Sequence, residues 1–83
     1  MTRFRVERQL PGLTEKHLGA LREALGEASR RLSHDGESVR YIRSSYDRKR
    51  SLCTCTFEAS SRQAVVMVNE VAQVPFLSIR ALP

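Results

Sequence analysis

Apolar and polar residues alternate along the first part of the chain, and this period of two is typical of a half-buried β-strand. In the stretch Arg3–Arg8, Phe4 and Val6 share one face, and Arg5 and Glu7 lie on the other. Two later stretches, Val39–Tyr46 and Leu52–Glu58, are rich in the β-branched and aromatic residues that strands favour. The polar segment Asp47–Arg50 between these stretches predicts a turn, so we expect them to pair as a hairpin.

Two other segments repeat apolar residues every three or four positions, which predicts amphipathic helices. The first begins after Thr14, a predicted N-cap, and ends near Ser33. The second opens with a predicted capping box of Ser60 and Gln63, and Pro75 ends it. A short last strand follows at residues 76–81. The predicted buried face of the second helix consists of Ala64, Val65, Val68, Val71 and Ala72.

The resulting order, β-α-β-β-α-β, predicts an α+β fold of the ferredoxin-like type over residues 1–83 as one domain. We expect a four-stranded antiparallel sheet with both helices on one face. The other face would carry no helix, and small domains often dimerise or bind ligands there, so we expect a homodimer. Its predicted residues include Arg3, Arg5, Glu7, Thr54 and Thr56, mixed with aromatic or aliphatic side chains of the second strand.

Composition narrows the choice of partners. The 83 residues are 41% hydrophobic and 28% charged, an ordinary globular balance without a long apolar run, so we expect no membrane segment. The N-terminus lacks the apolar region of a signal peptide, which predicts a cytoplasmic protein. The net charge of +5 would suit anionic partners. However, the third strand lacks the paired aromatic residues of RNA-binding modules, so a nucleic-acid partner is not expected.

Cys53 and Cys55 are the cysteines of the chain. The period of two places both on the face of Phe57, which belongs in the core, and free cysteine behaves as a small buried hydrophobe. Neighbouring positions i and i+2 on a strand lie about 6.5–7 Å apart, which is at the outer limit for a disulfide. A zinc site would require two more ligands elsewhere. Core packing is therefore the first interpretation, and a soft-metal or redox pair is the alternative.

Other residues could contribute to a site. His17 and His34, near the two ends of the first helix, are candidate metal ligands because imidazole binds transition metals, but both are also expected in exposed positions. Arg5, Glu7, Tyr41 and Tyr46 are candidates to line a pocket for a small organic molecule. No hydrolase triad, P-loop, dinucleotide fingerprint or HExxH motif is present, so an enzymatic activity is left open.

Several motifs resemble a family of small bacterial ferredoxin-like domains of unknown function, one branch of which binds nickel as a dimer. The segment Arg3-Phe-x-Val-Glu-Arg8-x-Leu-Pro-Gly-Leu-Thr14 is similar to the family opening. Val39–Ser44, Cys55–Ala59 and the pair Ala64-Val65 continue the resemblance. The resemblance implies the same fold and a dimer that binds nickel. The family often carries histidine where this chain has Val68, which removes one metal donor.

Three functions follow from these observations. The first is a dimeric protein that binds a transition metal, with nickel implied by the resemblance and His17, His34, Cys53 and Cys55 as the donors to test. The second is a binding protein or cofactor-free enzyme for a small organic ligand. The third is a structural or interaction module without a ligand.

Overall fold

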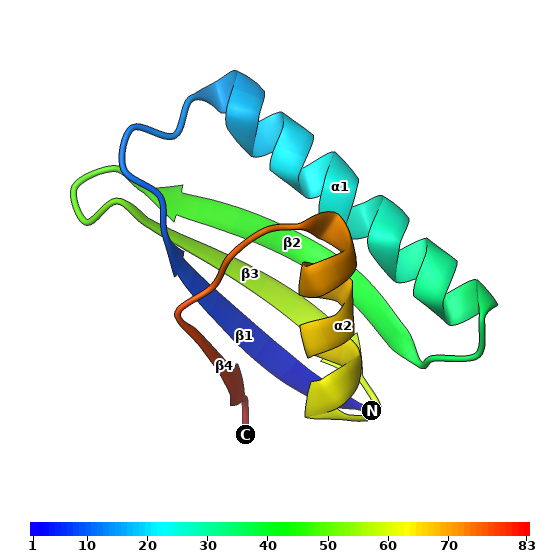
Figure 1. The fold of residues 1–83 in the computed structure, drawn as a ribbon. Coiled ribbons are helices and arrows are strands. Elements are labelled where there is room, and N and C mark those ends of the chain that lie inside the picture. The colour runs from blue at the N-terminus through cyan, green and yellow to red at the C-terminus, as the bar shows by residue number, and fades with distance from the viewer.

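The computed structural model describes residues 1–83, and it contains the predicted six elements in the predicted order (Figure 1). The sheet has the strand order β2-β3-β1-β4 and is antiparallel throughout. Both helices cover one face of it (Figure 1), as in the ferredoxin-like fold. Neither helix combines the length and apolar character needed to cross a lipid bilayer. The elements are β1 (Thr2–Gln9), α1 (Glu15–His34), β2 (Val39–Asp47), β3 (Leu52–Ala59), α2 (Arg62–Ala72) and β4 (Ser78–Ala81).

Local side-chain contacts explain where the first helix begins and where the chain turns between β2 and β3. The Thr14 hydroxyl accepts a hydrogen bond from the His17 backbone N–H, so the predicted N-cap of α1 is confirmed. In the β2–β3 turn, the Asp47 carboxylate accepts hydrogen bonds from the backbone N–H groups of Lys49 and Arg50. An aspartate that binds its own following backbone in this way favours a tight turn. These contacts place β2 and β3 side by side as predicted.

The core lies between the sheet and the helices. Leu18, Leu21, Leu25, Ala28 and Leu32 of α1 are all buried, as the stripe predicts. From the sheet, Phe4, Val6 and Phe57 point toward the helices and are almost or fully inaccessible to solvent. The core is mostly apolar, but it contains a buried arginine where β1, β3 and α2 meet.

The structure corrects two predictions about α2. Its N-cap is Ser61, whose hydroxyl accepts from the Ala64 backbone N–H, and not Ser60. Val71 is 45% exposed, and Asn69 is buried in its place at 1% exposure. Gln73 ends the helix in the left-handed conformation, with a φ of 58°. The chain then crosses residues 74–77 before β4, so the last strand is shorter than the predicted 76–81.

A β-bulge in β2 changes which side chains face the core. The register shifts between Tyr41 and Arg43, so Ile42 is an extra residue in the strand. As a result Tyr41 pairs with Phe57 and Tyr46 with Cys53, and both tyrosines lie on the helix-covered face. Aromatic or aliphatic side chains of the second strand were predicted on the helix-free face, and for the two aromatic ones this prediction was wrong.

Candidate functional site

Six polar side chains, five of them buried and Tyr41 partly buried, form a buried polar chain beneath the two helices. At one end, the Tyr41 hydroxyl lies 2.6 Å from the Ser44 hydroxyl, which lies 3.0 Å from the Cys55 sulfur. The Cys55 and Cys53 sulfurs are 4.0 Å apart. At the other end, Arg8 lies opposite Cys53 in the sheet and donates to the Asn69 side chain at 2.8 Å. The members of this buried polar chain are Tyr41, Ser44, Cys55, Cys53, Arg8 and Asn69.

Arg8 is a buried cation without a carboxylate partner. It follows Phe4 and Val6 in the alternation of β1, which places it on the core face with 1% of its surface exposed. Its guanidinium also donates to the backbone carbonyls of Pro75 at 3.2 Å and Val74 at 3.4 Å, while its Nε–H has no partner. None of the four ion pairs of the chain includes it. A charge buried in this way costs several kcal/mol unless an anion compensates it.

The two thiols beside Arg8 have opposite ionisation tendencies. The hydrogen bond from Cys53 lowers the pKa of Cys55, and the positive charge of Arg8 and the Ser44 hydroxyl lower it further against the effect of burial. The same hydrogen bond, together with burial, raises the pKa of Cys53. The pair therefore holds one proton between two sulfurs when Cys55 is ionised. In that state it carries one negative charge, which balances Arg8.

We expect thiolate ultraviolet absorbance to reveal one ionisation below the ordinary cysteine pKa of about 8.5. Because the pKa of Cys55 is lower in the folded than in the unfolded chain, its ionisation stabilises the fold above the unfolded pKa. This stabilisation is lost as the pH falls through the folded pKa. The test combines absorbance titration with urea unfolding at each pH.

Two serine variants provide the controls for this titration. Cys55→Ser is expected to abolish the low ionisation. Cys53→Ser is expected to retain it, because a serine hydroxyl can still donate to the Cys55 thiolate. A joint titration of both thiols above the ordinary pKa would contradict the prediction.

The four predicted pocket residues do not lie together. Arg5 and Glu7 are on the helix-free face, where Glu7 accepts from Arg80 at 3.3 Å. Tyr46 is on the opposite face and donates to the Leu10 carbonyl at 2.7 Å. This hydrogen bond connects the loop before α1 to β2. Tyr41 packs edge-to-face on Phe57 with ring centroids 5.5 Å apart, and burial raises its pKa. The sheet itself therefore separates the predicted set into two pairs.

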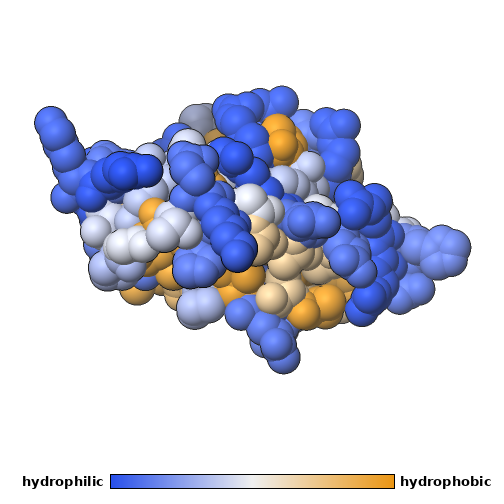
Figure 2. Space-filling model, turned by 90° about the horizontal axis from the view of Figure 1, so that it is seen from above, coloured by the Kyte–Doolittle hydropathy of each residue, from blue (hydrophilic) through white to orange (hydrophobic).

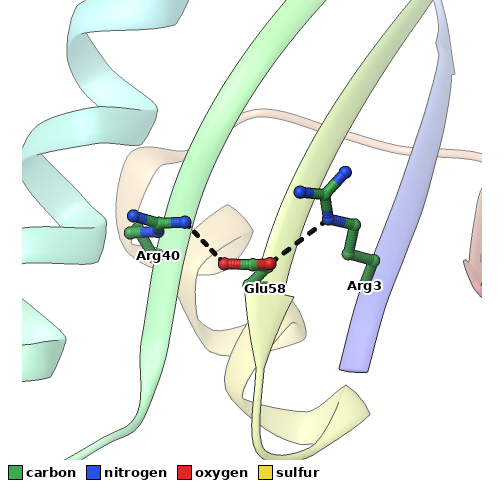
Figure 3. A network of polar contacts seen from close by, with 3 residues as sticks. All are labelled: Arg3, Arg40 and Glu58. Carbon is green, nitrogen blue, oxygen red and sulfur yellow. Dashed lines mark hydrogen bonds and ion pairs between the residues drawn. The ribbon is translucent and has the colours of Figure 1, made fainter. Parts of the chain in front are cut away.

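Charged side chains cover the helix-free face of the sheet. Glu58 lies between two arginines from the neighbouring strands, accepting from Arg40 at 2.6 Å and Arg3 at 3.2 Å (Figure 3). These two hydrogen bonds lower the pKa of Glu58. The pairs are open to solvent, and exposed ion pairs contribute little to stability. The face is a charged surface rich in exposed arginines.

The predicted metal donors do not meet within one chain. His17 lies in the first turn of α1 and His34 is its last residue, so they are about 25 Å apart at 1.5 Å of rise per residue. Both are exposed, whereas Cys53 and Cys55 are fully buried and free. No three His, Cys, Asp or Glu side chains in the chain are close enough together to hold one ion.

A groove lies between the second half of α1 and the start of β2. Its volume is about 740 Å³, which is within the range of about 300–1,000 Å³ common for ligand pockets. His34, Glu37, Arg30 and Tyr41 contribute to its walls. Ser29 also lines it, and the hydroxyl of this serine is buried without a hydrogen-bond partner. Of the predicted site residues, His34 and Tyr41 are thus brought to the same groove.

Comparisons with known proteins place the chain in a family. The sequence model described as "Nickel responsive protein SCO4226-like" matches residues 4–81, nearly the whole chain. The chain belongs to the SCO4226-like family of nickel responsive proteins. The crystal structure of SCO4226 from Streptomyces coelicolor A3(2) is similar in fold, with a TM-score of 0.81 and 23% sequence identity. The match covers 98% of this chain and 95% of that one. No curated protein sequence matched.

Membership of the SCO4226-like family confirms the resemblance found in the motifs. Val68, at the position where the resemblance implied a histidine, is fully buried in α2. Sequence reasoning missed Arg8, Ser44 and Asn69. The alternation of β1 contained the signal for Arg8, because Phe4, Val6 and Arg8 share one face.

Proposed function

We propose that this chain is a nickel-binding protein that forms its metal site from two copies. The observation that carries the proposal is the match of the nickel responsive family over residues 4–81. Because one chain brings together no three metal-binding side chains, a second copy would have to supply the missing donors. We propose His34 as a metal ligand because its imidazole suits nickel. Glu37 lines the same groove and adds a carboxylate.

The surface supports pairing of two copies through the helical side. Figure 2 shows a largely hydrophilic surface with apolar side chains gathered toward its lower edge. Val71 and Leu77 are 45% and 68% exposed, and Val74 and Phe76 between them are partly exposed. The helix-free face, by contrast, would bring its arginines against those of the other copy. We therefore propose a homodimer that uses the end of α2.

The test is thermal unfolding with and without Ni²⁺, together with sedimentation analysis of the same samples. At a free Ni²⁺ concentration of about 100 times the dissociation constant, we expect a stabilisation of about 2.7 kcal/mol and therefore a higher melting temperature. His34→Ala is expected to remove this shift. His17→Ala, which changes the other exposed histidine of α1, is the matched control and is expected to retain it.

The same melting temperature with Ni²⁺ and with a chelator would contradict the nickel proposal. An equal loss of the shift in both histidine variants would contradict the assignment to His34. A monomer that still binds Ni²⁺ would contradict the role of the second copy.

The groove favours a second candidate function, the binding of a small organic anion. Arg30 lines it together with Tyr41, and the unpartnered Ser29 hydroxyl could donate to a ligand oxygen. Benzoate is a suitable probe, because it pairs a carboxylate with an aromatic ring. Saturating benzoate is expected to raise the melting temperature of the wild-type protein, and Ser29→Ala to reduce that increase. No change with benzoate in the wild-type protein would count against this function.

A further inference from the structure

The sulfur pair has the spacing of a metal chelate. Two thiolates that bind one ion at about 2.3 Å each lie about 3.8 Å apart at a tetrahedral angle and at most about 4.6 Å apart in a line. The Cys53 and Cys55 sulfurs are separated by 4.0 Å, between these limits. An ion between them would replace the protons of the thiols. The backbone would not need to move, because both side chains already point to the same side of β3.

The buried charge beside the sulfur pair favours a monovalent over a divalent ion. Arg8 is buried beside the sulfurs, its Nε–H has no partner, and no carboxylate compensates it. Two thiolates and one monovalent cation together carry a net charge of −1, which would compensate the positive charge of Arg8. A divalent ion would make the pair neutral and leave Arg8 without a counterion.

The small number of donor side chains also favours a monovalent ion that accepts two ligands. Besides the two sulfurs, the Ser44 hydroxyl lies 3.0 Å from the Cys55 sulfur, and no third His, Cys, Asp or Glu side chain completes a set of donors. Zinc almost always takes four ligands, and nickel prefers nitrogen and oxygen donors in a square arrangement. Cu⁺ is soft, binds thiolates and accepts two ligands. We propose that Cys53, Cys55 and Arg8 form a buried two-sulfur site for Cu⁺, separate from the nickel site and independent of it.

Binding exchanges one cation for the thiol protons. The pair takes up Cu⁺, forms two sulfur–copper bonds and releases its protons to solvent, with no change of oxidation state. Since neither sulfur is exposed, the ion enters only after a local opening of the fold. Binding is therefore measured after long anaerobic equilibration.

The experiment is a competition for Cu⁺ between the untagged protein and a chromogenic Cu⁺ chelator under anaerobic conditions. We expect one Cu⁺ per chain and X-ray absorption with two sulfur ligands and no nitrogen ligand. Cys53→Ser and Cys55→Ser are each expected to weaken binding by more than about 100-fold, and Arg8→Lys by about 10-fold to 100-fold as a neighbour of the ligands. His34→Ala is expected to leave Cu⁺ binding unchanged.

Several results would overturn the proposal. They include nitrogen ligands in the absorption spectrum and Cu⁺ affinity that survives both serine substitutions. Displacement of Cu⁺ by excess Zn²⁺ or Ni²⁺ would contradict the charge argument. The wild-type absorption spectrum remains decisive if a variant fails to fold. Retained Ni²⁺ stabilisation in Cys53→Ser would show that the two metals use different sites, so either proposal can fail alone.

Discussion

Replacing Arg8 with methionine is expected to lower the free energy of unfolding by about 3 kcal/mol or more. The substitution removes the donors to the Asn69 side chain and to the carbonyls of Val74 and Pro75. Each buried acceptor left without a partner costs about 1–3 kcal/mol. This loss is a large part of the roughly 4–12 kcal/mol expected for a chain of this length. Urea unfolding at neutral pH measures it.

Arg5→Met is the matched control, because Arg5 lies on the same strand and points to the opposite face. It is exposed and takes part in none of the four ion pairs. Its replacement is expected to change stability by no more than about 0.5 kcal/mol. Equal effects of the two substitutions would mean that the buried hydrogen bonds of Arg8 add no more stability than an exposed arginine does. A stabilising Arg8→Met would mean that the desolvation cost of the arginine exceeds the gain from its three acceptors.

The elements of the fold could be predicted because each has a local signal. Alternation in Arg3–Arg8 and the three- and four-residue spacing from Leu18 to Leu32 require no knowledge of distant contacts. The predicted N-cap of α2 was wrong by one residue, because Ser60 and Ser61 both suit that position. The prediction that Val71 is buried was wrong for a different reason. Asn69 is buried next to it because it binds Arg8, 61 positions earlier, and helix periodicity contains no information about that partner.

The candidate site depends on contacts that a pattern cannot supply. Tyr41 and Tyr46 are five residues apart, so a regular strand would place them on opposite faces. The bulge at Ile42 adds one residue and turns both toward the core. The burial of Cys53 and Cys55 was predicted from Phe57 and is confirmed. Their ionisation could not be predicted, because it depends on Arg8 of one neighbouring strand and Ser44 of the other.

Phe57→Ala is expected to lower the free energy of unfolding by about 3–5 kcal/mol, the range for loss of a buried aromatic side chain. Phe57 is fully buried at the centre of β3, paired with Phe4 on one side and Tyr41 on the other. Its edge-to-face contact with Tyr41 adds about 0.5–1.5 kcal/mol that alanine cannot replace. Urea unfolding gives the change, and an unaltered m-value would establish that the same surface still becomes exposed.

Thr54→Ala is the matched control, because Thr54 lies on the opposite face of the same strand. It separates the loss of core packing from a general weakening of β3. Thr54 is only partly buried, so its replacement is expected to cost less than about 1 kcal/mol. A loss below about 1.5 kcal/mol for Phe57→Ala would mean that α1 moves onto the sheet and fills the space. In that case Tyr41 would move as well, and its hydrogen bond to Ser44 would break. Because Ser44 lowers the pKa of Cys55, the thiolate titration would then shift upward in the same variant, which links the packing of the core to the ionisation of the sulfur pair.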